Sequence, residues 1–184
     1  MAELVIRRAK STDLSRFLEI YAPYILDTTY SFEYTVPTME DFTERFRKIT
    51  SFYPWLAAEL NGVVVGYAYG SRMFERAAYM WDADVSIYVE KGYHGMKIGS
   101  KLYRELEDIL RKMGYCNLYA IITGENESSL MFHEKCGYTR EAKMERVGCK
   151  FGRWLDVYWY VKRIRNEEPS APPCPWYEIP EQTP

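Results

Sequence analysis

The chain has few histidines and cysteines, the residues on which zinc sites and disulfide frameworks depend. Its 184 residues include two histidines and four cysteines, and no two cysteines have C-x-x-C spacing. Structural zinc sites and disulfide scaffolds both depend on such clusters, so both are poorly supported. We expect no metal site, and reduced thiols of the kind found in cytoplasmic proteins.

Long apolar runs and an excess of one charge are also missing. No hydrophobic run approaches the ~20 residues that cross a bilayer, and Met1 leads directly into a strand-like ELVIRRA rather than a cleaved signal. The formal net charge of −2 gives no electrostatic footprint for nucleic acid. We therefore expect a cytoplasmic protein that binds neither membranes nor nucleic acid, in which local groups hold any anionic ligand.

The common glycine motifs for phosphate are absent, yet residues 83–111 have the pattern of a strand, a glycine-bearing turn and a helix. Neither G-x-G-x-x-G nor G-x-x-x-x-G-K-[ST] occurs. Gly92, Gly95 and Gly99 lie in the turn, and the helix that follows has one apolar face. Amides at a helix N-terminus attract phosphate. An ordinary strand-to-helix turn is the alternative, because short glycine motifs often occur by chance.

The composition fits one well-cored domain followed by a different kind of segment. With 47% hydrophobic and 27% charged residues, the chain is long enough for one core and short for two. Six of the nine prolines lie in the last sixteen residues. We therefore predict a domain at 1–165 and a proline-rich extension at 166–184, which Trp176, Tyr177 and Ile179 are suited to anchor.

Periodicity and capping residues predict a strand, two helices, three or four strands, a helix, a strand, a helix and two strands, in that order. Asn61-Gly62 is a strong hairpin signal, and a kink or bulge is expected within the long strand at 77–89. Residues 26–37 have no clear period and are predicted to be irregular. The predicted strands are 4–9, 53–60, 63–70, 77–89, 117–123, 138–147 and 154–161. Two of the predicted helices begin after caps at 12–13 and 38–41, a third runs from Gly99 to Arg111, and a fourth covers 127–135.

This order of elements resembles the GNAT acyltransferase fold, and two motifs carry the resemblance. The turn YHGMKIGS occupies the place of the family's [QR]-x-x-G-x-[GA] pyrophosphate loop, and NESSLMFHEKCGY matches N-x-x-A-x-x-L-Y-x-x-x-G-[FY] in spacing. Within that superfamily, YPWLAAELNGVVVGYAYG, RAAYMWDADVSIYV, HEKCGYT and KFGRWLDV resemble the phosphinothricin and methionine sulfoximine N-acetyltransferases. The resemblance extends from about Val5 to Lys162, which leaves the extension outside it. It implies an α+β fold in which helices flank a mixed, mostly antiparallel central sheet.

The resemblance implies direct acetyl transfer from acetyl-CoA to the α-amino group of a small glutamate-like amino acid or analogue, by a homodimer. It also implies a set of coenzyme contacts. The residues implied are Ile87, Tyr88 and Val89 for the pantetheine arm, His94, Gly95, Met96, Lys97, Ile98, Gly99 and Ser100 for the pyrophosphate, and Asn126 and Ser129 at the following helix. Asn126 equally suits a helix cap. His94 and Lys97 depart from the family's usual arginine or glutamine and glycine.

Two residues are the implied catalysts. An α-amino group with a pKa of ~8 is mostly protonated at neutral pH, so a general base promotes attack. Asp84 occupies the position of the family's glutamate, and Asp82 is a rival on the same face of a regular strand. His133 stands where many family members carry a tyrosine that protonates the departing thiolate. A structural aspartate and a satisfied core histidine are the alternatives.

The acceptor side is less well specified. Arginine binds carboxylate or phosphinate in a bidentate manner, so Arg72 and Arg76 are candidate substrate contacts. Tyr30 and Phe32, from the irregular segment, are candidates to close over the substrate, and Trp154 either contacts it or packs. An N-acetyltransferase for another amino acid or small amine, and a CoA-binding module without turnover, remain competing functions.

Overall fold

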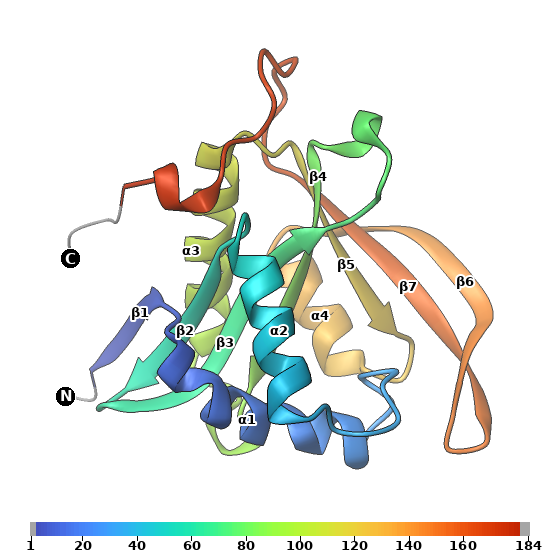
Figure 1. Ribbon diagram of the computed structural model, residues 1–184. Coiled ribbons are helices and arrows are strands. Elements are labelled where there is room, and N and C mark those ends of the chain that lie inside the picture. The colour runs from blue at the N-terminus through green and yellow to red at the C-terminus, as the bar shows by residue number, and fades with distance from the viewer. Residues whose placement is uncertain (1–2, 181–184) are drawn as a thin grey trace.

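The computed structural model describes residues 3–180, which form one seven-stranded sheet with helices on both faces (Figure 1). The strand order is β1-β2-β3-β4-β5-β7-β6, and only the β4–β5 pair is parallel. This mixed, mostly antiparallel sheet confirms the predicted α+β fold. The elements are β1 (Leu4–Arg8), α1 (Leu14–Leu26), α2 (Met39–Thr50), β2 (Trp55–Leu60), β3 (Val63–Arg72), β4 (Asp82–Val89), α3 (Ile98–Met113), β5 (Asn117–Thr123), α4 (Glu127–Lys135), β6 (Thr139–Lys150) and β7 (Arg153–Arg163).

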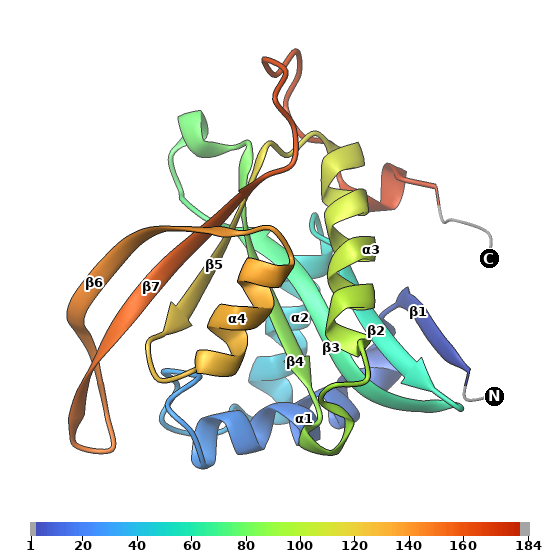
Figure 2. The same cartoon turned by 180° about the vertical axis from the view of Figure 1, so that it is seen from behind.

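Each face of the sheet has its own hydrophobic core. Helices α1 and α2 cover one face of β2, β3 and β4, and Phe17, Phe42 and Trp55 are buried between them. Helices α3 and α4 lie on the opposite face, which the reversed view in Figure 2 shows in front of the sheet. Leu102 and Leu106 on the apolar side of α3 are buried there, as their helical spacing predicted.

The sheet divides at its centre. Strands β4 and β5 pair over three residues only, from Asp82 opposite Asn117 to Asp84 opposite Tyr119. Beyond that point β4 stays with β3, whereas β5 continues with β7. The edges of β4 and β5 that face each other are therefore unpaired over the second half of each strand, which leaves backbone groups open to another partner.

Three of the predicted strands have clearly different boundaries in the structure. The stretch 77–89 is not one kinked strand, because Ala77–Tyr79 forms a 3-10 turn and β4 begins at Asp82. The last two strands are longer than predicted and meet at a tight turn. Both residues of that turn, Phe151 and Gly152, have positive φ angles of 51° and 71°, and an aromatic residue in such a position is not a turn signal that a sequence pattern identifies.

The proline-rich extension folds back onto the domain. Trp176 donates its indole N–H to the main chain of the last residue of α2 (2.7 Å), and the Arg8 guanidinium lies 4.6 Å from the Trp176 ring centroid. Ile179 is buried, whereas Tyr177 is exposed. Two of the three predicted anchors therefore contact the domain; residues 181–184 of the extension lie outside the described residues.

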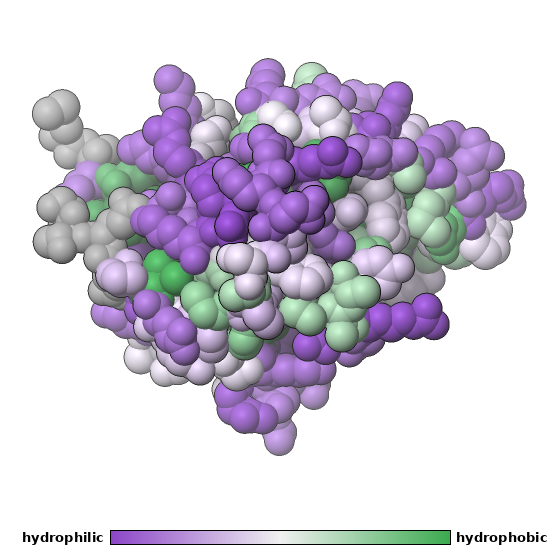
Figure 3. Space-filling view, turned by 90° about the horizontal axis from the view of Figure 1, so that it is seen from above, coloured by the Kyte–Doolittle hydropathy of each residue, from purple (hydrophilic) through white to green (hydrophobic). Residues whose placement is uncertain are grey.

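Residues 3–180 contain neither a candidate membrane span nor a candidate metal-binding cluster. None of their helices combines the length and apolar character that a membrane crossing requires. These residues also contain no group of three or more histidine, cysteine or acidic side chains arranged for a metal ion. On the face seen in Figure 3, hydrophobic residues form small areas among hydrophilic ones.

Candidate functional site

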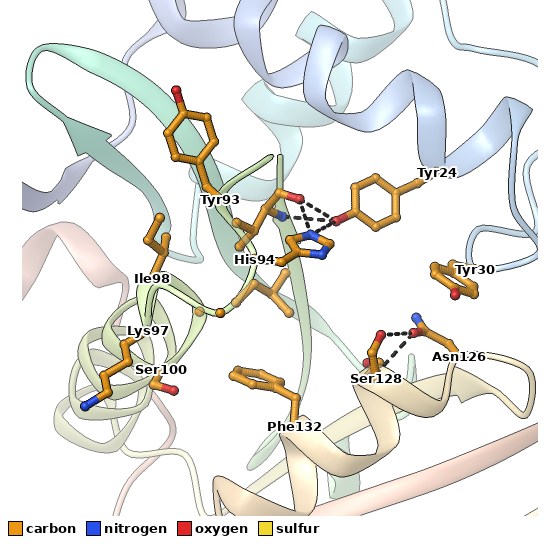
Figure 4. A pocket seen from close by; sticks show the side chains of 15 residues that line it. Tyr24, Tyr30, Tyr93, His94, Lys97, Ile98, Ser100, Asn126, Ser128 and Phe132 are labelled. Atoms are coloured by element: carbon orange, nitrogen blue, oxygen red, sulfur yellow. Dashed lines mark hydrogen bonds between the residues drawn. The ribbon is translucent and has the colours of Figure 1, made fainter. Parts of the chain in front are cut away.

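A cavity of about 350 Å³ lies where the glycine-bearing turn enters α3. Figure 4 shows side chains from α1, the turn, α3 and α4 around it. Ten of the residues that the sequence implied for the coenzyme line this cavity. They are Ile87, Val89, His94, Gly95, Lys97, Ile98, Gly99, Ser100, Asn126 and Ser129. The fold therefore brings ten of the twelve predicted coenzyme residues together; Tyr88 and Met96 are the other two.

The start of α3 offers backbone donors to this cavity. The N–H groups of Ile98, Gly99 and Ser100 belong to the first turn of α3, where no intrahelical acceptor exists. A Cβ atom at Gly99 would lie 3.1 Å from the Phe132 ring, so glycine allows α3 and α4 to approach closely. These amides and the positive end of the helix dipole suit a diphosphate.

Lys97 adopts the backbone conformation that glycine usually provides in this loop. Its φ of 61° and ψ of 14° lie in the left-handed region, which costs a non-glycine residue roughly 1 kcal/mol. Lys97 nevertheless keeps the first turn of α3 intact, and its exposed ammonium is available to a phosphate. The departure from the family pattern leaves the geometry of the loop in place.

The unpaired edge of β4 is partly occupied by the protein's own side chains. The Tyr24 hydroxyl donates to the Val89 carbonyl oxygen (2.5 Å), and His94 Nε2 lies 2.8 Å from the same oxygen (Figure 4). Because backbone groups alternate in direction along an antiparallel strand, Ile87 and Val89 face the gap, while Tyr88 bonds to β3. Ile87 is thus open to a strand-like ligand, Val89 is covered, and Tyr88 is unsuited to the predicted backbone role.

Asn126 caps α4. Its side-chain oxygen accepts hydrogen bonds from the Ser129 N–H (3.2 Å) and the Ser128 hydroxyl (2.9 Å). The capping alternative is therefore present in the structure. Asn126 also lines the cavity, so the cap and a coenzyme contact are compatible.

A smaller chamber of about 80 Å³ continues from the cavity into the gap between β4 and β5. Ser86 and Tyr88 line it from the face that carries α1, together with Tyr30. Tyr103 and His133 line it from the α3 and α4 side. The chamber therefore crosses the sheet, and groups from its two faces meet around one small volume.

Asp84 lies at the start of this gap. Side chains alternate along a strand, so Asp84, Ser86 and Tyr88 share one face, and the Ser71 hydroxyl donates to the Asp84 carboxylate at 3.4 Å. Burial raises the pKa of Asp84 from 3.8 to about 7, against a small opposing effect of that hydrogen bond. A carboxylate with such a pKa is suited to accept a proton near neutral pH.

Asp82, the rival base, has a different environment. Its carboxylate accepts a hydrogen bond from the Asn117 side-chain amide at 2.8 Å, where β4 and β5 still pair. This contact joins the two strands just before they separate. We therefore assign Asp82 a structural contact.

His133 is buried and paired with a tyrosine that the sequence analysis did not select. Its Nδ1 lies 2.7 Å from the Ser129 carbonyl oxygen, so Nδ1 carries the proton, and Nε2 accepts from the Tyr103 hydroxyl at 2.8 Å. Burial lowers the pKa of His133 to about 4, which keeps the imidazole neutral. The proton nearest the chamber therefore belongs to Tyr103, whose own pKa burial raises well above 10.

The four predicted acceptor residues do not come together. Arg72 follows Ser71 on β3 and so points to the face opposite Asp84, where it pairs with Glu75 (3.1 Å). Arg76 is exposed in the loop before β4. Tyr30 lines both the cavity and the chamber.

The remaining aromatic candidates lie toward the β6–β7 hairpin. A Cβ atom at Gly148 would lie 2.1 Å from the Phe32 ring, so Phe32 packs directly on the β6 backbone. Trp154 is 57% exposed, with the Arg146 guanidinium 5.7 Å from its ring centroid. Phe32 therefore joins the irregular segment to the hairpin, whereas Trp154 lies on the surface.

Tyr24 and Tyr103 are not among the residues predicted from the sequence, because both have the spacing of core residues. Tyr103 lies between Leu102 and Leu106 on the buried side of α3, and a tyrosine there is typical of packing. The available signal was the lone histidine on α4, since a buried imidazole needs a partner for each nitrogen. Tyr24 carries no comparable signal.

Comparison with known proteins agrees with this geometry. The chain is 33% identical over 171 residues to a phosphinothricin N-acetyltransferase of Streptomyces viridochromogenes, which covers 92% of this chain and 91% of that protein. It is 34% identical over 172 residues to an L-methionine sulfoximine/L-methionine sulfone acetyltransferase of Salmonella typhimurium. That match covers 92% of this chain and 98% of the relative.

Solved structures give the same result. A GNAT superfamily phosphinothricin acetyltransferase from Sinorhizobium meliloti in complex with acetyl-CoA has a TM-score of 0.84 at 33% identity, covering 87% of this chain and 88% of that chain. Residues 6–159 match the family model described as an acetyltransferase (GNAT) domain. The chain therefore belongs to the GNAT acetyltransferase family, as its motifs predicted, and is an enzyme of that family related to the phosphinothricin and methionine sulfoximine N-acetyltransferases.

Proposed function

We propose that the enzyme transfers the acetyl group of acetyl-CoA directly to the α-amino group of a small glutamate-like amino acid or analogue, of the phosphinothricin and methionine sulfoximine type. The observation that carries this proposal is the gap between β4 and β5. Around it lie the free amides of α3, the Asp84 carboxylate and the Tyr103–His133 pair. The names of the related enzymes support the class of acceptor.

The residues around the larger cavity fit acetyl-CoA, which supplies the acetyl thioester. The first-turn amides of α3 and the exposed Lys97 would hold the diphosphate. The Ile87 backbone would pair with the pantetheine amides in the manner of an added strand, beside the Phe132 ring. The Val89 backbone joins this pairing only when Tyr24 and His94 move away.

Asp84 acts as the general base in this proposal. The acceptor's ammonium has no lone pair, so it loses a proton to Asp84, directly or through one water molecule, before nitrogen attacks the thioester carbon. A pKa of about 7 leaves much of the carboxylate ionised at neutral pH. An aspartate reaches less far than the glutamate of related enzymes, which favours the route through water.

Tyr103 supplies the second proton transfer. As the N–C bond forms and the C–S bond breaks, the Tyr103 hydroxyl turns its single proton from His133 Nε2 toward the leaving thiolate and donates it there. His133 has no proton on Nε2 and its Nδ1–H is bound to a backbone carbonyl, so it orients the tyrosine rather than donating. This role replaces the direct donation by His133 that the sequence implied. The acylated nitrogen then loses its second proton, which restores the Tyr103 hydroxyl, and the proton on Asp84 leaves for solvent.

The acceptor enters from the face that carries α1, because Asp84 lies on that face. Tyr30 and Phe32 then form one wall of the entrance, and Arg76 is the proposed partner for the acceptor's carboxylate. Arg72 is left out of this assignment, since it faces the other side of the sheet.

A homodimer in the cytoplasm is the proposed state of the enzyme. Strand β6 lies at the edge of the sheet, and nine consecutive residues, from Thr139 to Val147, are exposed. The hairpin it forms with β7 projects from the body of the molecule (Figure 1). A second copy would cover this edge. The four cysteines are free thiols, which suits a reducing compartment. Light scattering of the purified protein tests the dimer.

The substrate proposal is tested by measuring acetyl-CoA-dependent thiol release with a panel of amines. Turnover with phosphinothricin or methionine sulfoximine supports it. Turnover confined to other amino acids or small amines instead supports the competing function, an N-acetyltransferase for another amino acid or small amine, which the same scaffold could provide. Acetyl-CoA binding without turnover on any amine would identify a CoA-binding module and reject the enzyme mechanism.

A further inference from the structure

Lys150, at the end of β6, is a buried cation outside the site described above. Its exposed fraction is 1%, which is rare for lysine. A buried ammonium is costly unless hydrogen bonds replace its hydration. Lys150 meets that requirement with the main chain: Nζ donates to the Ile25 and Ser31 carbonyl oxygens, each at 2.6 Å. The ammonium also lies 5.1 Å from the Phe151 ring centroid.

The two carbonyls belong to segments far from β6 in sequence. Ile25 is in the last turn of α1, where carbonyl groups lack intrahelical donors and the helix dipole attracts a cation. Ser31 is in the irregular segment that joins α1 to α2, which we call the α1–α2 loop (residues 27–37). Lys150 therefore fixes the end of α1 and the middle of this loop to the hairpin at one point.

Two further contacts fix the same loop to the same hairpin. Phe32 packs on Gly148, where a Cβ atom would lie 2.1 Å from the ring. The Tyr34 hydroxyl donates to the Cys149 carbonyl oxygen. Contacts from three consecutive hairpin residues, 148–150, thus determine where a loop without regular structure lies.

Hydrogen bonds beside α4 hold the other side of the α1–α2 loop. The Thr29 hydroxyl donates to Glu125 at 2.9 Å, and Arg153 of β7 binds the same carboxylate at 2.8 and 3.1 Å. Tyr30, between these attachments, lines the cavity and the chamber. Its position relative to Asn126 and Ser86 therefore depends on the attachments on both sides.

We propose that Lys150 is a positioning residue for acceptor binding: it holds the α1–α2 loop against the β6–β7 hairpin, so that Tyr30 and Phe32 form the acceptor wall of the site. This inference rests on the proposed function, since it assigns the loop to the amine and not to the coenzyme. Of the loop's residues, Tyr30 alone borders the coenzyme cavity, whereas the diphosphate contacts at α3 are made by other elements. Loss of the lysine should therefore affect the two substrates unequally.

The test compares Lys150→Met with Lys143→Met, a control at an exposed position of the same strand. Methionine retains most of the stem but leaves two buried carbonyls without a donor. Gly148→Ala is a second variant, which displaces Phe32 without changing the lysine. For variants shown to be folded by circular dichroism, we expect the KM for the amine to rise roughly 10-fold or more, while the Kd for acetyl-CoA stays within about twofold.

An amine KM within about twofold of wild type in both folded variants would overturn the proposal, because it would assign Lys150 to stability alone. Equal losses for both substrates would also overturn it. If wild type turns over no amine, the proposed function fails instead. Hydrogen exchange in the α1–α2 loop then tests whether Lys150 holds this loop against the hairpin. Faster exchange in Lys150→Met than in Lys143→Met supports that role, and equal exchange rejects it.

Discussion

Replacing the proposed base by its uncharged isostere, Asp84→Asn, should strongly reduce turnover while making the protein more stable. In the folded state the pKa of Asp84 rises from 3.8 to about 7 through burial. The folded protein therefore binds a proton that the unfolded chain has lost between these two pH values. Stability falls as the pH rises through that window and stays reduced above it.

The size of the effect follows from the shift. About three pKa units at ~1.36 kcal/mol each correspond to about 4 kcal/mol above pH 7. Asp84 retains part of its surface, so solvent reduces this figure to roughly 2–4 kcal/mol. At pH 5 the difference from the asparagine variant should shrink to below ~2 kcal/mol, because folded Asp84 is then protonated and only the unfolded carboxyl is ionised.

Urea unfolding at pH 5 and pH 8 measures the stability difference, and thiol release measures catalysis. The general-base role predicts a loss of roughly 10²- to 10⁴-fold in kcat/KM for the amine, with acetyl-CoA affinity retained. Asp82→Asn, at the carboxylate two residues earlier, is the matched control and should keep most of the activity. A variant no more stable than wild type at pH 8, or one that still turns over normally, would refute the assignment.

Three other variants test separate parts of the structure. Tyr103→Phe removes the proposed proton donor and should lower kcat by roughly 10²-fold with unchanged acetyl-CoA Kd; a normal kcat would exclude Tyr103. Tyr24→Phe removes one of the two side chains that cover the Val89 carbonyl and should leave acetyl-CoA binding equal or up to about 10-fold tighter by calorimetry, whereas weaker binding would make Tyr24 a coenzyme contact. Trp176→Ala should destabilise the fold by about 2 kcal/mol in urea unfolding without changing the KM of either substrate; unaltered stability would mean that the extension contributes no support.

The fold was largely predictable from the sequence because its strongest signals are local. Hairpin residues Asn61 and Gly62 both have positive φ, as their type predicts, and Thr38 accepts the Asp41 N–H at the start of α2. The resemblance of the motifs to a known family then predicted how these strands and helices are arranged in the fold. The predicted strand boundaries were wrong where the local signal was unusual. At Phe151, a φ of 51° allows β6 and β7 to continue as far as a tight turn.

The site was predictable only where one segment carries it. Residues 94–100 are consecutive and run from the turn into the start of α3, so the proposed phosphate-binding region could be identified from adjacent residues. Contacts between distant segments could not. The partner of His133 comes from α3, 30 residues earlier, and the carbonyls bound by Lys150 lie 119 and 125 residues away in sequence.

Side-chain direction was a further source of error. Arg72 and Ser71 are neighbours in sequence but point to opposite faces of β3, so nearness to Asp84 in the chain gave Arg72 a role that its face does not allow. The alternation along β4 likewise separates the Tyr88 backbone from the open edge that Ile87 and Val89 share. Register, which the sequence does not specify, decides both cases.

The central claim is that the gap between β4 and β5 seats the acetyl thioester between Asp84 and Tyr103. A crystal structure with bound acetyl-CoA tests it most directly. We predict the diphosphate on the amides of Ile98, Gly99 and Ser100, the pantetheine arm along Ile87, and the sulfur within hydrogen-bonding reach of the Tyr103 hydroxyl. A coenzyme bound elsewhere, or one whose thioester lies outside the gap, would contradict the account.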